Sequence, residues 1–170
     1  MGKSIQLNNV SFTYGSHGKT IFNDLSYHFQ KNKTTVFLGS NGIGKSTLLS
    51  LLIGFIQPDS GSLALDTAPY ATISQQEMGK QIAFLPQIES TPIFLNVEEF
   101  ITMGRSPYLS RFNAPDQNDS RIVESIIQQL NLNAIRNSKM NHISGGELQL
   151  AFLARALAQE PEVLIMDEPM

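Results

Sequence analysis

The chain has 170 residues and contains no cysteine and no tryptophan. Without cysteine it can build neither a disulfide scaffold nor a metal site that depends on thiolate ligands. Charged residues make up 16% of the sequence, below the usual share in globular proteins, and the formal net charge is -3. A slightly acidic chain with so few charges lacks the basic surface of nucleic-acid-binding proteins, so we expect no nucleic-acid partner.

Long apolar runs are also lacking. The longest mostly apolar run covers residues 48–56, which is much shorter than a membrane span. The N-terminal stretch MGKSIQLNNV has no apolar core of the kind found in secretory signals. We therefore expect a cytoplasmic chain with room for one domain, which would reach a membrane only through a partner.

The hydrophobic pattern predicts an α/β fold. Alternation at Val10 and Phe12, and again at Leu25 and Tyr27, predicts an antiparallel pair of half-buried strands near the N-terminus. The run TTVFLG, residues 34–39, is apolar on successive residues, which is typical of a strand covered on both faces. Further predicted segments are strands at 81–86 and 161–169, helices at 45–54, 96–104, 120–130 and 147–159, and a polar loop at 110–119.

The stretch GSNGIGKS fits the phosphate-binding pattern G-x-x-x-x-G-K-[ST] and lies between a predicted strand and a predicted helix. Glycines allow successive backbone N–H groups to surround an anion, a lysine adds positive charge, and a serine hydroxyl suits Mg²⁺. A plain glycine-rich turn is the alternative. The predicted nucleotide-binding residues are Gly39, Ser40, Asn41, Gly42, Ile43, Gly44, Lys45, Ser46 and Thr47.

Two acidic residues follow the apolar run VLIM near the C-terminus. Asp167 at the end of a buried strand can hold Mg²⁺ through water, and Glu168 can orient or deprotonate an attacking water. Many apolar strands end in an acid, so this signal gains its weight only from the phosphate-binding loop upstream.

The stretch ISGGE supports two interpretations at once. Ser144 and Glu147 have the spacing of a capping box at the start of the apolar helix 147–159. Gly145 and Gly146 are costly inside a first helical turn, yet they expose N–H groups that a phosphate could use.

The motifs GSNGIGKST, LPQ, ISGGE and IMDEP, in this order, resemble the nucleotide-binding subunit of ABC transporters over the whole chain. The resemblance implies a P-loop NTPase core with an N-terminal antiparallel β subdomain and a helical insertion. We expect residues 1–87 to form the β subdomain and P-loop core, 88–145 the helical subdomain, and 146–170 the signature helix and the acidic strand.

Carried over by residue, the resemblance implies an ATPase that uses ATP and Mg²⁺. Tyr14 would stack on adenine, and Gln87 would sense Mg²⁺ and couple to a membrane subunit. Ser144, Gly145 and Gly146 would contact the γ-phosphate held by a second, head-to-tail copy. The implied catalytic residues are Glu168 as base, Lys45 and Gln87, and the implied magnesium ligands are Ser46, Gln87 and Asp167.

Within the family, the stretch TMGRSPY resembles importers of iron–siderophore, haem or vitamin B12 complexes, with Gly104, Arg105 and Pro107 forming a GR-x-P element. Such a subunit would work with membrane permease subunits at the inner face of the cell membrane. A helix-ending glycine followed by a loop is the simpler interpretation of this element. A non-transport ABC ATPase and a nucleotide-binding fragment without hydrolytic activity stay open as alternative functions.

The sequence departs from the family pattern at Ser40, Leu150 and Met170, where proline, arginine and threonine are usual. In the family, further strands follow the acidic one, and one of them carries a histidine that contacts the γ-phosphate. His142 and the other two histidines of this chain all precede Asp167. We therefore expect a chain without the last third of the domain, as a truncated or a split protein, with little ATP hydrolysis of its own.

Overall fold

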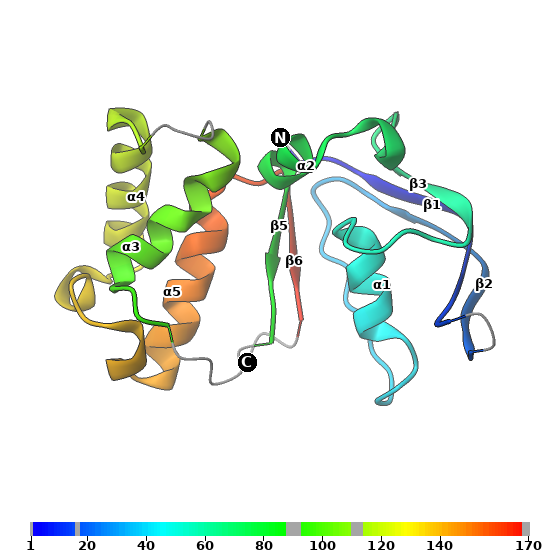
Figure 1. The fold of residues 1–170 in the computed structure, drawn as a ribbon, viewed down its shortest axis with the longest axis horizontal. Helices are drawn as coiled ribbons and strands as arrows, with labels where there is room; N and C mark the ends of the chain where they lie inside the picture. Colours follow the sequence, from blue (N-terminus) through cyan, green and yellow to red (C-terminus); the bar gives the residue numbers. More distant parts are fainter. Residues whose placement is uncertain (1, 16–17, 88–92, 110–113, 168–170) are drawn as a thin grey trace. The chain divides into compact units, whose positions relative to one another are not determined.

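The computed structural model describes residues 2–15, 18–87, 93–109 and 114–167. The chain divides into two compact units, residues 1–78 and residues 79–170 (Figure 1). The three-part division expected from the sequence, with boundaries after residues 87 and 145, stays a prediction. Within the described ranges, no helix has both the length and the apolar character needed to cross a bilayer.

The first unit contains an antiparallel sheet with the strand order β2-β1-β3-β4. The predicted pairing of β1 (Ile5–Thr13) with β2 (Thr20–Phe29) is confirmed, and Val10 lies opposite Leu25. The sequence pattern did not predict β3 (Ser60–Leu65) and β4 (Ala68–Pro69), which pair with each other on the far side of β1.

The core of the first unit follows an irregularity in β1. Ile5 and Leu7 are buried, and after a shift in strand register the buried positions become Val10 and Phe12. Asn9 lies at this shift with a positive φ of 48°. Side chains alternate with a period of two, so the extra residue moves the buried positions from odd to even numbers and the same face of the sheet stays buried.

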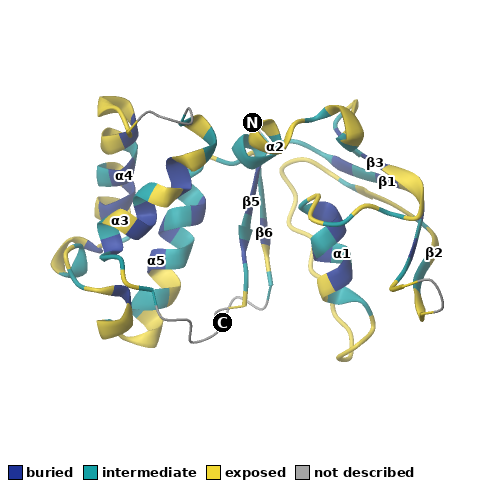
Figure 2. Ribbon diagram, in the orientation of Figure 1, coloured by how far each residue is buried: buried dark blue, intermediate teal, exposed yellow. Residues whose placement is uncertain are grey.

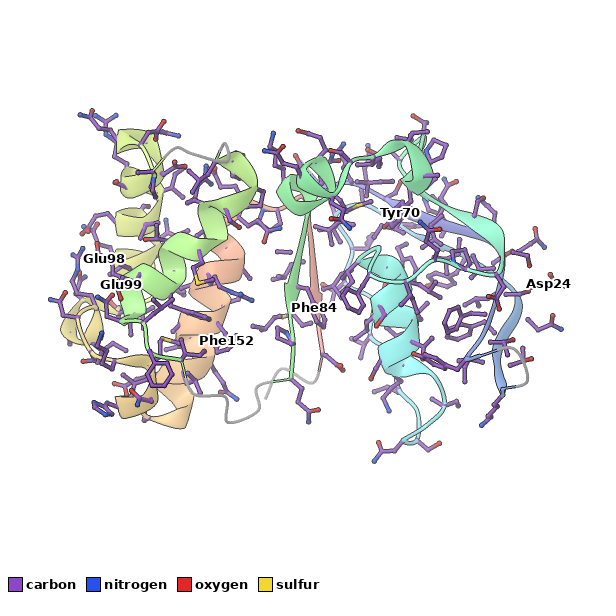
Figure 3. The ribbon with its side chains drawn as sticks, viewed as in Figure 1. Asp24, Tyr70, Phe84, Glu98, Glu99 and Phe152 are labelled. Atoms are coloured by element: carbon purple, nitrogen blue, oxygen red, sulfur yellow. The ribbon has the colours of Figure 1, made fainter. Side chains whose placement is uncertain are left out.

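The helix α1 (Lys45–Leu52) belongs to the same unit and buries Leu49, Leu51 and Leu52 (Figure 2). Tyr70, in the short 3₁₀ helix η1 (Tyr70–Thr72), donates its hydroxyl proton to the carbonyl oxygen of Leu52 at 2.9 Å (Figure 3). Burial raises the pKa of Tyr70 above its ordinary value. The neutral hydroxyl therefore satisfies one of the carbonyl groups that the end of α1 leaves unpaired.

The prediction of a doubly covered strand at residues 34–39 is wrong in this structure. These residues form no strand, and Val36 and Leu38 are 72% and 92% exposed. A strand needs neighbours that pair with its N–H and C=O groups, and none of the strands that the structure describes pairs with this segment. An apolar run supplies side chains for a strand but not the partner.

The second unit contains a two-stranded parallel sheet of β5 (Ile82–Leu85) and β6 (Val163–Met166), in which Leu85 lies beside Met166. The helix α2 (Gln75–Gln81) leads into β5. The sequence predicted a longer, continuously buried strand at 161–169. Instead β6 has four residues, of which only Ile165 is buried, and Met166 is 43% exposed.

The described part of the second unit also contains the α-helices α3 (Val97–Thr102), α4 (Gln117–Gln129) and α5 (Gly145–Ala158). Each begins with a capping box, in which side chains accept hydrogen bonds from the N–H groups of the N-cap residue and of the third helical residue. Two short 3₁₀ helices, η3 (Asn133–Ile135) and η4 (Met140–His142), lie between α4 and α5. The helices predicted at 120–130 and 147–159 are confirmed, with α4 starting three residues earlier.

The expectation that the helix at 96–104 ends at Gly104 is wrong. The chain continues from α3 directly into η2, a 3₁₀ helix over Met103–Tyr108 that includes Gly104. A glycine ends a helix when it takes up a left-handed conformation, and Gly104 is not among the glycines with positive φ.

The helical core is made of apolar side chains from α3, α4 and α5. On α5 every buried residue is an alanine, so the neighbouring backbones can approach closely. Phe152 of α5 packs with its ring centroid 4.8 Å from that of Phe100 on α3 (Figure 3). The buried cluster comprises Val97, Phe100, Ile101, Val123, Ile126, Ile127, Leu132, Met140, Ala151, Ala154 and Ala158.

Candidate nucleotide-binding site

The glycine-rich loop ends in two residues with left-handed backbone conformations. Gly42 has a φ of 77° and Gly44 a φ of 110°, which side-chain-bearing residues rarely adopt. A Cβ atom on Gly44 would also lie 2.6 Å from Cγ2 of Ile21. Both the backbone conformation at position 44 and its close approach to β2 therefore require glycine.

The first turn of α1 differs from the starts of α3, α4 and α5. Gly44 is its N-cap and makes no side-chain capping hydrogen bond, and no acidic residue lies in the first turn. The first N–H groups of a helix have no partner within the helix, and the helix dipole adds a partial positive charge there. This end of α1 therefore has the chemistry of an anion-binding site.

Lys45 adds a full positive charge to the loop. Its Nζ donates to the carbonyl oxygens of Gly39 at 2.7 Å and Ser40 at 3.2 Å. These bonds use two of the three N–H donors of the ammonium group and hold it against the loop that precedes α1. The donor set suits a phosphate, which accepts several charge-assisted hydrogen bonds.

Tyr14 lies against the same helix. Its hydroxyl oxygen is 3.3 Å from Oγ1 of Thr47 in the first turn of α1. Its ring meets that of Phe12 edge to face, with the centroids 4.9 Å apart. The structure thus brings the predicted adenine-stacking residue to the first turn of α1, where phosphate binding is predicted, while 53% of the Tyr14 surface stays exposed.

Gln87 and Asp167 lie at the same end of the two-stranded sheet in the second unit. Asp167 follows β6 directly, and its N–H donates to the carbonyl oxygen of Leu85 at 2.9 Å. Gln87 follows β5 after Pro86. A carboxylate and an amide oxygen are hard donors that suit Mg²⁺. Ser46, the third predicted ligand, belongs to the first unit, and Glu168 lies outside the described residues.

The described residues contain no cluster of three or more histidine, cysteine, aspartate or glutamate side chains that could hold a metal ion by themselves. The predicted magnesium set instead combines a hydroxyl, an amide and a single carboxylate. Such a set suits an ion that keeps several waters and takes its remaining oxygens from a phosphate.

The capping box predicted at Ser144 is present. The N–H and the hydroxyl of Ser144 both donate to Oε2 of Glu147, at 2.8 Å and 2.7 Å. These hydrogen bonds lower the pKa of Glu147 below its ordinary value. A Cβ atom on Gly145 or Gly146 would meet nothing within 4 Å, so packing among the described residues does not explain these two glycines.

A family model for ABC transporters matches residues 22–170. The chain belongs to the ABC transporter family. The resemblance drawn from the P-loop, the ISGGE stretch and the acidic strand is thereby confirmed at the level of the family.

Several relatives within the ABC family are similar over nearly the whole chain. The chain is 35% identical over 170 residues to the "Probable siderophore transport system ATP-binding protein YusV" of Bacillus subtilis (strain 168), covering 99% of this chain and 61% of that protein. It is 32% identical over 166 residues to the petrobactin import ATP-binding protein YclP of the same strain, covering 98% and 64%. The chain thus spans about three fifths of the length of the curated relatives it matches.

Solved structures confirm the predicted ABC-type α/β fold. A chain from the structure of a metal-chelate type ABC transporter in an inward-facing conformation matches with a TM-score of 0.82 and 31% identity, covering 99% of this chain and 61% of that one. A nucleotide-free ATP-binding cassette from an ABC transporter matches with a TM-score of 0.83 at 22% identity, covering 99% and 70%.

Arg105, which the sequence singled out as part of an importer-like element of the ABC family, is buried, with only 2% of its surface exposed. Its Nε donates to Oδ1 of Asp119 at 2.8 Å, and one terminal nitrogen donates to the carbonyl oxygen of Ala158 at 2.7 Å and to Glu160 at 2.8 Å. The guanidinium also lies 3.9 Å from the ring centroid of Tyr108. Arg105 therefore joins η2 to the start of α4 and the end of α5.

The end of α5 is held from a second side as well. The hydroxyl of Tyr108 donates to the carbonyl oxygen of Gln159 at 2.9 Å. The side-chain amide of Gln159 in turn donates to the carbonyl oxygens of Gly79 and Ile82. We define the side chains of Arg105, Tyr108 and Gln159 as the clamp, because together they connect η2, the end of α5 and the start of β5.

The sequence did not predict the clamp. It indicated Arg105 only as part of the element that resembles importers, with no partner for its side chain. One local signal was available, the capping-box spacing of Asp116 and Asp119 at the start of α4. Asp119 takes part both in that capping box and in the ion pair with Arg105. Burial by itself would lower the pKa of Arg105, but its hydrogen bonds to Asp119 and Glu160 outweigh burial and raise that pKa.

The ion pair predicts a pH dependence of stability. Burial alone would raise the pKa of Asp119, but the hydrogen bonds from Arg105 and from the N–H of Asp116 lower it below its ordinary 3.8. A carboxyl with a lowered pKa in the folded state stabilises fully above its unfolded pKa and loses this contribution as the pH falls through the folded pKa. The difference in unfolding free energy between the parent and Asp119→Asn should therefore be full above about pH 5 and shrink below about pH 4.

Urea unfolding of both proteins at pH 7 and at pH 3 measures this difference. Asp66 and Glu147 also have lowered pKa values, but they titrate in both proteins and cancel in the comparison. A difference that is the same at both pH values would show that the Asp119 charge does not stabilise the fold.

Proposed function

We propose that this chain binds MgATP at the loop 39–47 and is part of an ATPase subunit that drives an ABC importer. The observation that carries the proposal is the start of α1, where left-handed Gly42 and Gly44 lead into a helix without a side-chain cap, beside the ammonium group of Lys45. The N–H groups and this ammonium would bind the β- and γ-phosphates, and the exposed ring of Tyr14 would stack on the base.

The proposed hydrolysis uses residues of both units. Ser46, Gln87 and Asp167 would hold Mg²⁺, which when bound neutralises charge on the β- and γ-phosphates. Glu168 would accept the proton of the attacking water, and Lys45 would stabilise the charge that develops on the γ-phosphate. The backbone N–H of Asp167, bonded to Leu85, supports this role because it fixes the residue beside the strand that leads to Gln87.

A second copy of the chain would complete the site. Gly145 and Gly146 lie in an open first turn of α5, and their cost to helix stability is not offset by packing within the described residues. We propose that Ser144, Gly145 and Gly146 face the γ-phosphate bound by a head-to-tail partner. Binding would require the Ser144 hydroxyl to turn away from Glu147, to which it now donates.

The proposed cargo is an iron–siderophore or a related metal chelate, and the proposed partners are permease subunits at the inner face of the membrane. The support is the printed function of the relatives, which include siderophore and petrobactin import proteins. Other relatives are named for the import of molybdate or zinc. The chelate class is therefore supported by the balance of the similar proteins, together with the GR-x-P element at Gly104, Arg105 and Pro107.

Thermal unfolding with and without MgATP tests the nucleotide site. At a ligand concentration of about 100 times Kd, binding stabilises by about 2.7 kcal/mol, which raises Tm by about 5–10 °C for a chain of this size. We expect this shift in the parent and its loss in Lys45→Ala. Lys19→Ala, which changes an exposed lysine of the same unit, is the matched control and should keep the shift. An equal shift in all three proteins, or none in the parent, would contradict the proposal.

A further inference from the structure

The contact between Tyr14 and Thr47 joins two parts of the site that are far apart in the sequence. Tyr14 follows the end of β1, and Thr47 is the third residue of α1. Their hydroxyl oxygens lie 3.3 Å apart, within hydrogen-bond distance. Thr47 is buried although it is polar, and Tyr14 is the hydrogen-bond partner found for its hydroxyl.

Two contacts fix the Tyr14 ring. The buried Phe12 meets it at 88°, edge to face, and its hydroxyl is held at α1. A tyrosine side chain has only two rotatable bonds that move the ring, so anchoring both the ring and its oxygen leaves little freedom. The remaining, exposed part of the ring is thereby presented in one orientation relative to the first turn of α1.

The Thr47 hydroxyl can form hydrogen bonds with Tyr14 and with a phosphate at the same time. A threonine hydroxyl has one proton to donate and two lone pairs to accept with. If it accepts the proton of Tyr14, its own proton remains available for a phosphate oxygen at the start of α1. The contact with Tyr14 therefore need not break when the site is filled.

We infer that the hydrogen bond between Tyr14 and Thr47 sets the separation between the base-stacking ring and the phosphate-binding turn, so that the site favours a nucleotide over a bare polyphosphate. The inference rests on the proposed function and makes Thr47 a positioning residue for the ring. A ligand without a base gains nothing from the orientation of Tyr14, whereas a nucleotide pays less to order the ring that it stacks on.

The test is a comparison of two ligands, MgATP and magnesium tripolyphosphate, titrated into the parent and its variants. Tyr14→Phe keeps the ring and removes the hydroxyl. A hydrogen bond of ordinary strength predicts that this change weakens ATP binding between about twofold and tenfold. Tripolyphosphate affinity should stay within about twofold of the parent, since the phosphate-binding groups are intact.

Two Thr47 variants complete a double-mutant cycle. Thr47→Ser keeps the hydroxyl and should retain most of the preference for ATP over tripolyphosphate. Thr47→Val removes the hydroxyl at similar size, and in its background Tyr14→Phe should have no further effect on ATP affinity. This non-additivity is a readout that a general loss of stability would not produce.

Three results of these titrations would overturn the inference. If Tyr14→Phe leaves ATP affinity unchanged, or weakens both ligands by the same factor, the hydroxyl does not position the ring for a base. Additive effects of Tyr14→Phe and Thr47→Val on ATP binding would overturn it as well. If the parent binds no ATP, the proposed function fails together with the inference, whereas ATP binding that depends on Lys45 but not on the Tyr14 hydroxyl overturns the inference alone.

Discussion

Replacement of Arg105 by alanine is expected to lower the free energy of unfolding by about 3 kcal/mol or more. Removing one partner of a buried ion pair leaves the other charge without compensation, and here Asp119 is itself buried. The change also removes the hydrogen bond to the carbonyl oxygen of Ala158 and the stacking on Tyr108. Urea unfolding, read from the midpoint at unchanged slope, measures the loss.

Arg136→Ala provides the matched control. Arg136 forms ion pairs with Glu98 and Glu124, so it has as many acidic partners as Arg105, but 28% of its side chain is exposed. Exposed ion pairs contribute little, and we expect a loss of about 1 kcal/mol or less. Equal losses in the two variants would show that burial is not what makes Arg105 important. Arg105→Lys should be intermediate, because lysine keeps the charge but not the planar donor set.

Gly104→Ala is expected to destabilise by about 3 kcal/mol, although alanine is normally the better residue in a helix. A Cβ atom on Gly104 would lie 2.2 Å from the carbonyl oxygen of Arg155 and 2.9 Å from Cβ of Ala158. The first of these atoms belongs to the backbone of α5, so relief requires the helix to move. Thermal and urea unfolding of the purified variant measure the effect.

Gly146→Ala gives the opposite expectation with the same chemical change. A Cβ atom at this position meets nothing within 4 Å, and alanine reduces the entropy of the unfolded chain. We expect stability to be unchanged or to rise by up to about 1 kcal/mol. If Gly104→Ala were as stable as Gly146→Ala, the close approach of η2 to α5 would not be a constraint on the fold.

The sequence predicted those features whose signals are local. The start of α1 at Lys45, the capping box of Ser144 with Glu147 and the helix α5 each depend on residues a few positions apart, and all three are present. The pairing of β1 with β2 was also predictable, since alternation marks each strand and a short loop joins them.

Features that depend on distant partners were not predictable in the same way. Residues 34–39 have the side chains of a buried strand but no neighbouring strand in the part of the chain that the structure describes. Arg105 carried a family signal, yet its contacts with Asp119 and Ala158 follow from packing across η2, α4 and α5. No periodic pattern in the sequence predicts contacts between side chains from three separate elements.

The clamp gives α5 the geometry of a lever. Its far end carries Gly145 and Gly146, and a helix of 14 residues is about 21 Å long. A tilt of α5 by about 5° about its C-terminal end would displace its N-terminal end, with Gly145 and Gly146, by about 2 Å. Such a displacement is enough to break a hydrogen bond. If Ser144 contacts a partner's phosphate as proposed, the position of this contact would therefore depend also on Arg105 and Gln159 at the opposite end of the helix.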